Sequence, residues 1–261
     1  ADALGPLTTR FAESGHELAL VGGPVRDIML GRPGVAHDLD LTTDARPERI
    51  EELVRGWADH VWDVGMRFGT VGARKGDHHL EITTYRSESY DADSRKPEVT
   101  FGDTLAGDLA RRDFTVNAMA VRLPSLEFVD LHDGMRDLSD RVLRTPIAPE
   151  ESFGDDPLRM MRAARFVSQL GFAIAPEVLA AMRDMAARLE IVSAERIRDE
   201  LTKLLLGARP RLGLAVLVET GLAAYVLPEL PGLQLEIDEH HRHKDVYEHS
   251  LIVMEQAIDL E

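Results

Sequence analysis

Residues 21–42 read VGGPVRDIMLGRPGVAHDLDLT, and this stretch decides how the first half of the chain folds. The apolar residues just before the glycine pair predict a short strand that ends in a turn. Pro24 suits the first position of a helix, where its missing N–H costs nothing. Residues 37–43, HDLDLTT, alternate with period two and predict a second strand. Strand, turn, helix and strand in this order indicate a mixed α and β domain.

The same stretch carries the groups for phosphate chemistry. Gly22 and Gly23 allow the backbone to approach a ligand closely, and a helix that starts there presents free N–H groups. We expect a triphosphate at this turn, clamped by Arg26 one helical turn further on. Asp38 and Asp40 share one face of the following strand, because alternate residues of a strand point the same way.

Paired carboxylates suit Mg²⁺, which prefers hard oxygen ligands and usually shares them with substrate phosphates. Glu81, in HLEITTYR at 79–86, is a candidate third carboxylate on a neighbouring strand. A lone Asp-x-Asp more often marks a solvated strand edge, and a lone Gly-Gly turn is equally weak. Their order and spacing together indicate a nucleotide site with bound Mg²⁺.

Composition limits the class of protein. With 44% hydrophobic and 29% charged residues, the 261-residue chain can build a substantial core. The net charge of −16 excludes a broad nonspecific nucleic-acid surface, although arginines gather at 95–112 and 159–165. The absence of cysteine excludes disulfides and thiolate metal sites. No apolar run is long enough to cross a membrane, no signal peptide is readable, and we expect a cytoplasmic protein.

The pattern of elements predicts an α+β fold. Residues 1–148 predict a head domain with a mixed β-sheet and flanking helices, in which 62–86 form two strands joined by the turn ARKGDHH. The polar segment 87–99 predicts a loop. Residues 149–235 carry apolar residues at helical spacing and predict an all-α neck and body. Residues 236–261 open another helix that the chain end interrupts, as expected for the start of a truncated domain.

One predicted helix, DDPLRMMRAARF at 155–166, carries a row of polar residues. This row steps by three positions around one helical face and comprises Asp156, Arg159, Arg162 and Arg165. An Asp acceptor beside an Arg fork can satisfy the polar edge of cytosine or adenine, while guanine and uracil present mismatched edges. The alternative is structural: Asp156 caps the helix and forms a surface pair with Arg159 that contributes ~0.3 kcal/mol.

Five motifs in order resemble the class II tRNA nucleotidyltransferases and poly(A) polymerases of the DNA polymerase β superfamily. Residues 22–42 are similar to the family's catalytic signature, and LARRDFTVNAMA at 109–120 is similar to its second motif. DGMRDLSDRVLRT at 133–145 resembles the third. The helix at 155–166 resembles the nucleotide-selecting helix, with Asp-Asp in place of the usual Glu-Asp, and 193–206 resembles the neck helix.

The resemblance, which runs from residue 17 to about 205, implies roles for individual residues. It assigns Mg²⁺ binding and activation of an RNA 3′ hydroxyl to the Asp38–Asp40 pair, and phosphate or ribose contact to Arg112. It places the triphosphate on Gly23 and Arg26. It assigns base reading to Asp156 and Arg159, with Arg162 and Arg165 nearby. The implied activity is template-independent addition of CMP and AMP to tRNA from CTP and ATP, with release of pyrophosphate; no protein partner is readable.

Several alternatives stay open. A poly(A) polymerase, or an enzyme that adds only A or only CC, would share these motifs. The histidine-rich stretch with His243 and His249 resembles the opening of an HD-type phosphohydrolase domain, so a phosphohydrolase with a nucleotide-sensing head is a second class of function. A noncatalytic RNA-binding module is a third. Outside the main site, residues 86–95, with Arg86, Asp93 and Arg95, form a loop that either assists the change from C to A addition or is simply a surface loop.

Other polar residues near the motifs have structural explanations. Arg111 and Arg112 would form a solvated helix start neutralised by Asp108 and Asp113, and Asn117 would bond to backbone. Only for Arg112 does the family resemblance favour a functional role over this structural explanation. His37 is expected to be structural.

Overall fold

The computed structural model describes residues 4–32, 38–65, 69–89, 98–102, 104–233 and 246–258. The chain divides into two compact units. The first comprises residues 1–89, 97–140 and 144–147, and the second comprises 90–96, 141–143 and 148–261.

The first unit is built on a seven-stranded mixed sheet with the strand order β3-β4-β5-β2-β1-β8-β9. Its strands are β1 (Leu18–Val21), β2 (Asp38–Thr43), β3 (His60–Gly65), β4 (Thr70–Lys75), β5 (His78–Thr84), β8 (Met119–Leu123) and β9 (Phe128–Asp130). Only β2 and β5 run parallel, while every other neighbouring pair is antiparallel. A separate pair, β6 (Arg86–Ser89) and β7 (Glu98–Phe101), is also antiparallel.

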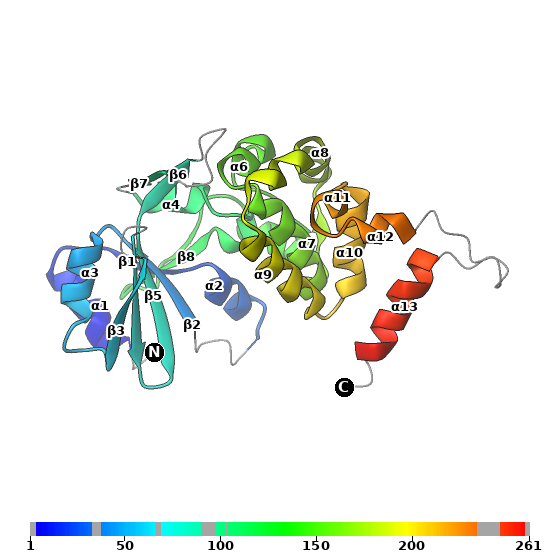
Figure 1. Ribbon diagram of the computed structural model, residues 1–261. Coiled ribbons are helices and arrows are strands. Elements are labelled where there is room, and N and C mark those ends of the chain that lie inside the picture. The colour runs from blue at the N-terminus through cyan, green and yellow to red at the C-terminus, as the bar shows by residue number, and fades with distance from the viewer. Residues whose placement is uncertain are drawn as a thin grey trace. The chain divides into compact units, whose positions relative to one another are not determined.

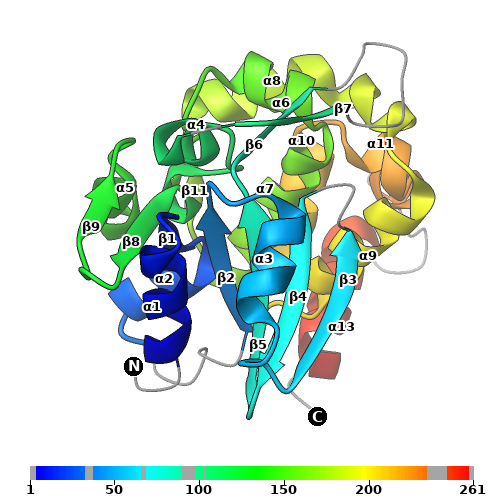
Figure 2. The same cartoon turned by 90° about the vertical axis from the view of Figure 1, so that its left-hand side faces the viewer.

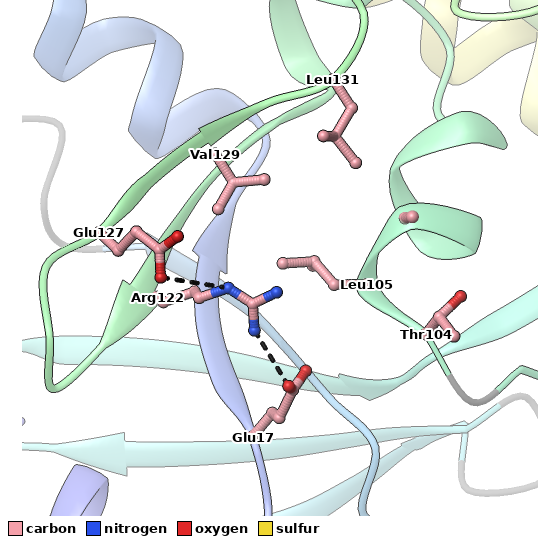
Figure 3. A pocket seen from close by; sticks show the side chains of 8 residues that line it. Glu17, Thr104, Leu105, Arg122, Glu127, Val129 and Leu131 are labelled. Atoms are coloured by element: carbon pink, nitrogen blue, oxygen red, sulfur yellow. Dashed lines mark hydrogen bonds and ion pairs between the residues drawn. The ribbon is translucent and has the colours of Figure 1, made fainter.

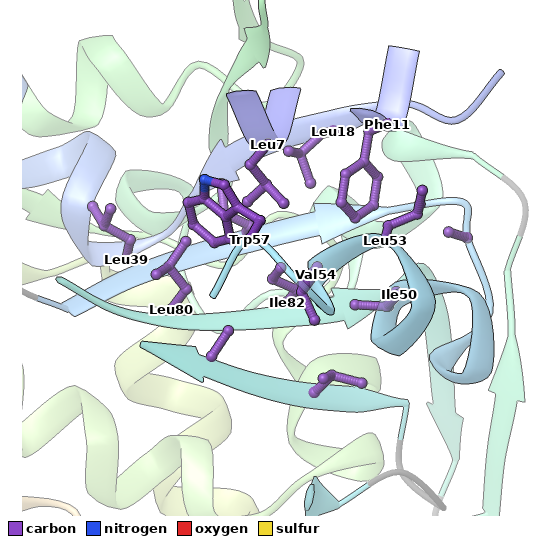
Figure 4. Packing of buried hydrophobic residues seen from close by; sticks show 14 residues of the cluster. Leu7, Phe11, Leu18, Leu39, Ile50, Leu53, Val54, Trp57, Leu80 and Ile82 are labelled. Carbon is purple, nitrogen blue, oxygen red and sulfur yellow. The ribbon is translucent and has the colours of Figure 1, made fainter. Parts of the chain in front are cut away.

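Helices cover this sheet on both faces (Figures 1 and 2). In the first unit they are α1 (Gly5–Glu13), α2 (Gly23–Met29), α3 (Pro47–Val54), α4 (Leu105–Ala110), the 3₁₀ turn η2 (Thr115–Asn117) and α5 (Gly134–Asp140). Both views place α1 and α3 on the same face of the sheet, and Figure 1 places α2 on the other. The main core lies under α1 and α3, where Phe11, Ile50 and Trp57 pack on Leu80 and Ile82 (Figure 4).

The alternation of β2 explains which face is left for chemistry. Leu39 and Leu41 point into the core beneath α1 and α3, so Asp38 and Asp40 point to the opposite face. The predicted placement of the two carboxylates on one face is therefore confirmed.

The structure corrects two element predictions. The described residues of 62–86 contribute to β3, β4 and β5, and Arg86 begins β6, where two strands were predicted. The difference arises because His60–Gly65 pairs with β4 as the separate edge strand β3. The predicted loop 87–99 is bounded by strand pairing, since β6 and β7 take up its two ends. Isolated short segments without a clear apolar alternation gain strand structure from a partner that the local sequence does not reveal.

The second unit is helical. It contains α6 (Pro149–Asp155), α7 (Leu158–Leu170), α8 (Pro176–Met185), the 3₁₀ segment η3 (Ala186–Ile191), α9 (Ala194–Leu205), α10 (Pro210–Glu219), α11 (Ala223–Val226), α12 (Glu229–Gly232) and α13 (Val246–Ile258). Two short parallel strands, β10 (Val142–Leu143) and β11 (Ala173–Ile174), pair within it. α7 packs against α9 and α10, and Gly213 permits the close approach, because a Cβ there would lie 2.8 Å from the Ala164 carbonyl oxygen. The α+β fold, a sheet-based head followed by a helical body, is thus confirmed.

Candidate active site

The bend after β1 brings an aspartate carboxylate and an arginine together. Gly22 has φ +72° and ψ −140°, a conformation that side-chain-bearing residues rarely adopt. A Cβ at this position would lie 3.2 Å from Nη1 of Arg112 and 3.4 Å from Oδ2 of Asp40. Gly22 is therefore needed for its backbone and for the space it leaves between these two charged groups. At Gly23, by contrast, a Cβ would make only an ordinary contact, 3.6 Å from Nη2 of Arg26.

Three carboxylates lie together on the face of the sheet opposite α1 and α3. Asp38 and Asp40 are exposed on β2, and the parallel register pairs Asp40 with Glu81 of β5. Desolvation raises the pKa of Glu81, and the negative charges of Asp40 and Asp38 raise it further. The three carboxylates line one cavity, so they are close enough for their charges to interact.

This arrangement fits a divalent cation without forming a complete cage. Within the described part of the chain, no three His, Cys, Asp or Glu side chains are already grouped as metal ligands. Mg²⁺ usually takes only one or two protein carboxylates and completes its shell with water and substrate phosphates. The crowded negative charge that raises the pKa of Glu81 is what a cation between Asp38 and Asp40 would neutralise.

Arg112 is held in place by a buried acid. Asp108 is 2% exposed and accepts hydrogen bonds from Nη2 of Arg112 at 2.9 Å and Nη2 of Arg111 at 3.1 Å. Burial by itself would raise the pKa of Asp108, but Arg112 and Arg111 outweigh burial and lower it. Neutralisation of both arginines by Asp108, which the structural explanation expected, is therefore confirmed. The expected solvated helix start is wrong, because Arg111 and Arg112 follow the end of α4 and are mostly buried. Nε of Arg112 has no hydrogen-bond partner among the described residues.

Arg26 is anchored by a second buried network. Its Nε and Nη2 donate to the two oxygens of Asp27 at 2.9 and 3.0 Å, and its Nη1 donates to Oδ1 of Asn117 at 2.8 Å. The Asn117 amide in turn donates to Asp113 at 2.9 Å. The expectation that Asn117 bonds to backbone is therefore wrong, because its side chain bonds to the side chains of Arg26 and Asp113. With Arg26 only 9% exposed, the network fixes the α2 end of the glycine bend; a triphosphate contact for Arg26 stays a prediction.

In the second unit, the start of α7 positions Asp156 and Arg159. Oδ1 of Asp156 accepts from the Leu158 backbone N–H at 3.1 Å, and Oδ2 pairs with Nη2 of Arg196 on α9 at 3.0 Å. Arg159 is 6% exposed and donates to the Ser152 hydroxyl at 2.8 Å. Asp156 thus ends α6 and accepts from the first residue of α7, whose N-cap position is taken by Pro157, so the predicted capping role is wrong. The ion pair of Asp156 is made with Arg196 and not with Arg159.

Further along α7, two arginines converge on one buried acid. Glu200 of α9 is 4% exposed and lies 3.2 Å from Nε of Arg165 and 3.7 Å from Nη1 of Arg162. The first contact is an ion pair without hydrogen-bond alignment. The Arg165 guanidinium also stacks 4.5 Å from the Phe166 ring centre. Arg165 therefore joins α7 to α9, and Arg162 is the more accessible of the two, with a third of its side chain exposed.

Sequence reasoning missed Asp27, Arg196 and Glu200 as supporting residues. Asp27 follows Arg26 directly and could have been suspected as its partner. Arg196 and Glu200 are 40 and 35 residues away in sequence from Asp156 and Arg165, which they contact. Several named candidates, His37, Asp93, Arg95 and His243, lie outside the described residues.

A separate cavity of about 410 Å³ lies away from these carboxylates (Figure 3). It is lined by Leu105, Val129 and Leu131 around Arg122. Arg122 donates to Glu17 at 3.0 Å and approaches Glu127 at 3.6 Å. Two carboxylates already neutralise this guanidinium, so the cavity offers no net positive charge for a phosphate.

Comparison with known proteins gives the family. Residues 18–144 match the poly A polymerase head domain, and residues 171–233 match the domain described as the probable RNA and SrmB-binding site of polymerase A. The CCA-adding enzyme of Levilactobacillus brevis is 44% identical over 221 residues, which are 84% of this chain and 54% of that relative. The chain belongs to the class II CCA-adding enzyme and poly(A) polymerase family.

Other members of the family extend the match. The CCA-adding enzyme of Lactococcus lactis subsp. cremoris is 40% identical over 266 residues, covering 98% of this chain and 64% of the relative. The crystal structure of the Bacillus stearothermophilus CCA-adding enzyme in complex with CTP superposes with a TM-score of 0.75 at 38% identity, over 86% of this chain and 53% of that one. The crystal structure of a tRNA nucleotidyltransferase complexed with a primer tRNA and an incoming ATP analog superposes with a TM-score of 0.72 at 25% identity. The match covers 95% of this chain and 74% of that one.

The chain spans 54% to 64% of the length of these two curated relatives. No helix in the part of the chain that the structure describes is long and apolar enough to cross a lipid bilayer.

Proposed function

We propose that this chain is the catalytic part of a CCA-adding enzyme, which adds CMP and AMP to the 3′ end of tRNA from CTP and ATP and releases pyrophosphate. The observation that carries the proposal is the glycine bend at Gly22, which leaves Asp40 and Arg112 side by side next to Asp38 and Glu81. Family relatives whose names state CCA addition support the choice of reaction.

In this proposal Asp38 and Asp40 hold a divalent cation, for which Mg²⁺ is the best match to carboxylate and phosphate oxygens. A bound cation would supply Lewis-acid stabilisation of the reacting phosphate oxygens. Glu81 lies beside Asp40 with a raised pKa, where it can accept the proton of the RNA 3′ hydroxyl.

The triphosphate would lie at the glycine bend. Gly22 and Gly23 expose backbone there, and Arg112 donates toward phosphate or ribose while Asp108 holds its Nη2. α2 has only seven residues, so the phosphate contacts depend on the bend and on Arg112 more than on a long helix dipole. Arg26 supports the bend through Asp27 and Asn117.

We assign selection of the base to Asp156 and Arg159. A carboxylate offers about four acceptor positions, and backbone and Arg196 contacts occupy one on each oxygen of Asp156, fixing its orientation. Arg162 would contribute from the same helix. Arg165 would act mainly by keeping α7 against α9 through Glu200.

The test is incorporation of each nucleotide supplied alone, on tRNA that lacks its terminal CCA. We expect CTP to extend the tRNA by two residues and ATP to extend only a CC-ended acceptor. Asp38→Ala and Asp40→Ala should each abolish incorporation while the far-ultraviolet circular dichroism spectrum stays unchanged. Normal incorporation by either folded variant would refute the proposal.

A poly(A) polymerase is the second candidate, because the family model that matches residues 18–144 is a poly A polymerase head domain. In the same assay it would add a run of A from ATP alone and no C from CTP. An enzyme that adds only A or only CC would stop at the corresponding step. Phosphoester hydrolysis without RNA would instead favour the phosphohydrolase.

We further propose that residues 1–148 act as the catalytic head, 149–235 as neck and body, and 236–261 as the start of a further domain. The compact division between residues 147 and 148 supports the first boundary. Because tRNA is the proposed acceptor, we place the activity in the cytoplasm.

A further inference from the structure

The carboxylates continue into an aromatic surface at the edge of the same sheet. The strand registers pair Trp62 with Gly72, Gly72 with Glu81, and Glu81 with Asp40. These four residues therefore form one row across β3, β4, β5 and β2. The row spans three inter-strand steps, ~14 Å at about 4.8 Å for each step. Gly72 contributes no side chain between the indole and the carboxylates.

Trp62 is 39% exposed although it is large and apolar. It meets the ring of His79 edge-on, with 6.2 Å between ring centres and an interplanar angle of 65°. A cavity of about 270 Å³ is lined by Trp62, His79 and the three carboxylates together. An exposed indole in the same cavity as the reacting groups offers a flat surface to a nucleobase.

The strand order indicates whether a base on Trp62 would belong to the acceptor RNA or to the incoming nucleotide. β2 lies between β1, which leads into the glycine bend, and β5, beyond which lie β4 and β3. In phosphoryl transfer the attacking and leaving oxygens are roughly in line across the phosphorus. With the triphosphate on the β1 side, pyrophosphate leaves there, and the acceptor hydroxyl approaches from the side of β5 and Trp62.

Charge agrees with an RNA strand on this side. In the neighbouring row, the strand registers place Arg74 of β4 opposite His60 of β3 and His79 of β5. Arg74 is two residues from Gly72, so its side chain lies on the same face as this row. Single-stranded nucleic acid is bound by aromatic platforms for bases together with positive charge for phosphates. We propose that Trp62 stacks on a base at the single-stranded 3′ end of the acceptor RNA and positions its terminal hydroxyl over the carboxylates. This inference rests on the proposed function.

Trp62 fluorescence provides a direct test on the full 261-residue chain. The chain has two tryptophans, and Trp57 is only 6% exposed in the core, so it gives a constant background. We expect an RNA minihelix with a single-stranded CC 3′ end to quench Trp62, and CTP alone to leave it unchanged. Trp62→Phe should remove the quenching. Absence of RNA quenching, or quenching by CTP alone, would overturn the proposal.

Kinetics separates stacking from a structural role. Trp62→Ala should raise KM for the minihelix roughly tenfold, near the lower end for base stacking on an aromatic side chain, and leave KM for CTP unchanged. Trp62→Phe should raise it less, because a smaller ring still stacks. The matched control is Phe128→Ala on β9, the opposite edge of the sheet, where a 40% exposed aromatic lies away from the carboxylates and both constants should stay unchanged. A higher KM for CTP, or an equal effect of Phe128→Ala, would contradict base stacking of the acceptor.

The two proposals fail differently. Quenching by the minihelix without any nucleotide incorporation would refute the CCA-adding function and retain the RNA contact of Trp62. Normal incorporation without quenching would refute only the Trp62 contact. Asp38→Asn should abolish incorporation and preserve the quenching, because the indole is separate from the cation ligands.

Discussion

Gly22→Ala tests whether the bend after β1 is built for the reaction or only for the fold. Gly22 holds φ at +72°, so any side chain there is strained, at about 1–3 kcal/mol. In a protein of this size, each kcal/mol lost from the free energy of unfolding lowers Tm by about 3 °C, so Tm should fall by roughly 3–9 °C. This part of the effect depends only on the backbone.

The second part is local to the reacting groups. The new Cβ would lie 3.2 Å from Nη1 of Arg112 and 3.4 Å from Oδ2 of Asp40, so at least one of them must move by a few tenths of an ångström. A displacement of ~1 Å in an active site costs on the order of a hundredfold in rate. We therefore expect kcat for CMP incorporation to fall by about tenfold or more.

Gly15→Ala is the matched control. Gly15 has φ +75°, and a Cβ there would meet nothing within 4 Å. It should lower Tm by a similar amount and leave kcat per folded molecule unchanged. The assay is steady-state CMP incorporation at a temperature where both variants are folded, alongside thermal unfolding by circular dichroism. Equal kcat for the two variants would refute the argument that Gly22 keeps space between Asp40 and Arg112.

Three further predictions concern charges. Asp108→Ala should lower the free energy of unfolding in urea by about 3–5 kcal/mol, because it removes the carboxylate that pairs with the partly buried Arg111 and Arg112. A loss below ~1 kcal/mol would show that these ion pairs contribute little to stability. Glu200→Gln should cost a similar ~3–5 kcal/mol, because it removes the buried negative charge that Arg165 faces. Glu200→Leu combined with Arg165→Met should restore most of that stability, and equal losses in both variants would contradict a charge effect. Asp40→Asn should lower the pKa of Glu81, measured by carbon-13 NMR of its carboxyl group, because a neighbouring negative charge is removed. Since the folded state keeps the Glu81 proton to higher pH than the unfolded chain does, stability from this group falls as pH rises from the ordinary glutamate value through the raised one. An unchanged pKa in Asp40→Asn, or stability that rises across that window, would refute the coupling.

Local sequence was sufficient for the elements around the bend. The alternation in 37–43 placed Asp38 and Asp40 on one face, since strand periodicity depends only on near neighbours. Pro24 after two glycines indicated the turn into α2. The helical spacing of 155–166 predicted most of α7, which begins at Leu158. Local sequence failed for the edge strand β3 and for the paired ends of 87–99, whose strand structure depends on distant partners.

Only the tertiary structure decided which side chains of different elements lie next to one another. That Glu81 lies beside Asp40 depends on β5 pairing in parallel with β2, and the alignment of Trp62 with the carboxylates depends on two further strand pairings. The contact of Asp156 with Arg196 depends on α9 packing against α7. Periodicity along a chain fixes the direction of a side chain within its own element. Its partners are fixed by long-range packing, because each contact joins groups that sequence spacing leaves independent.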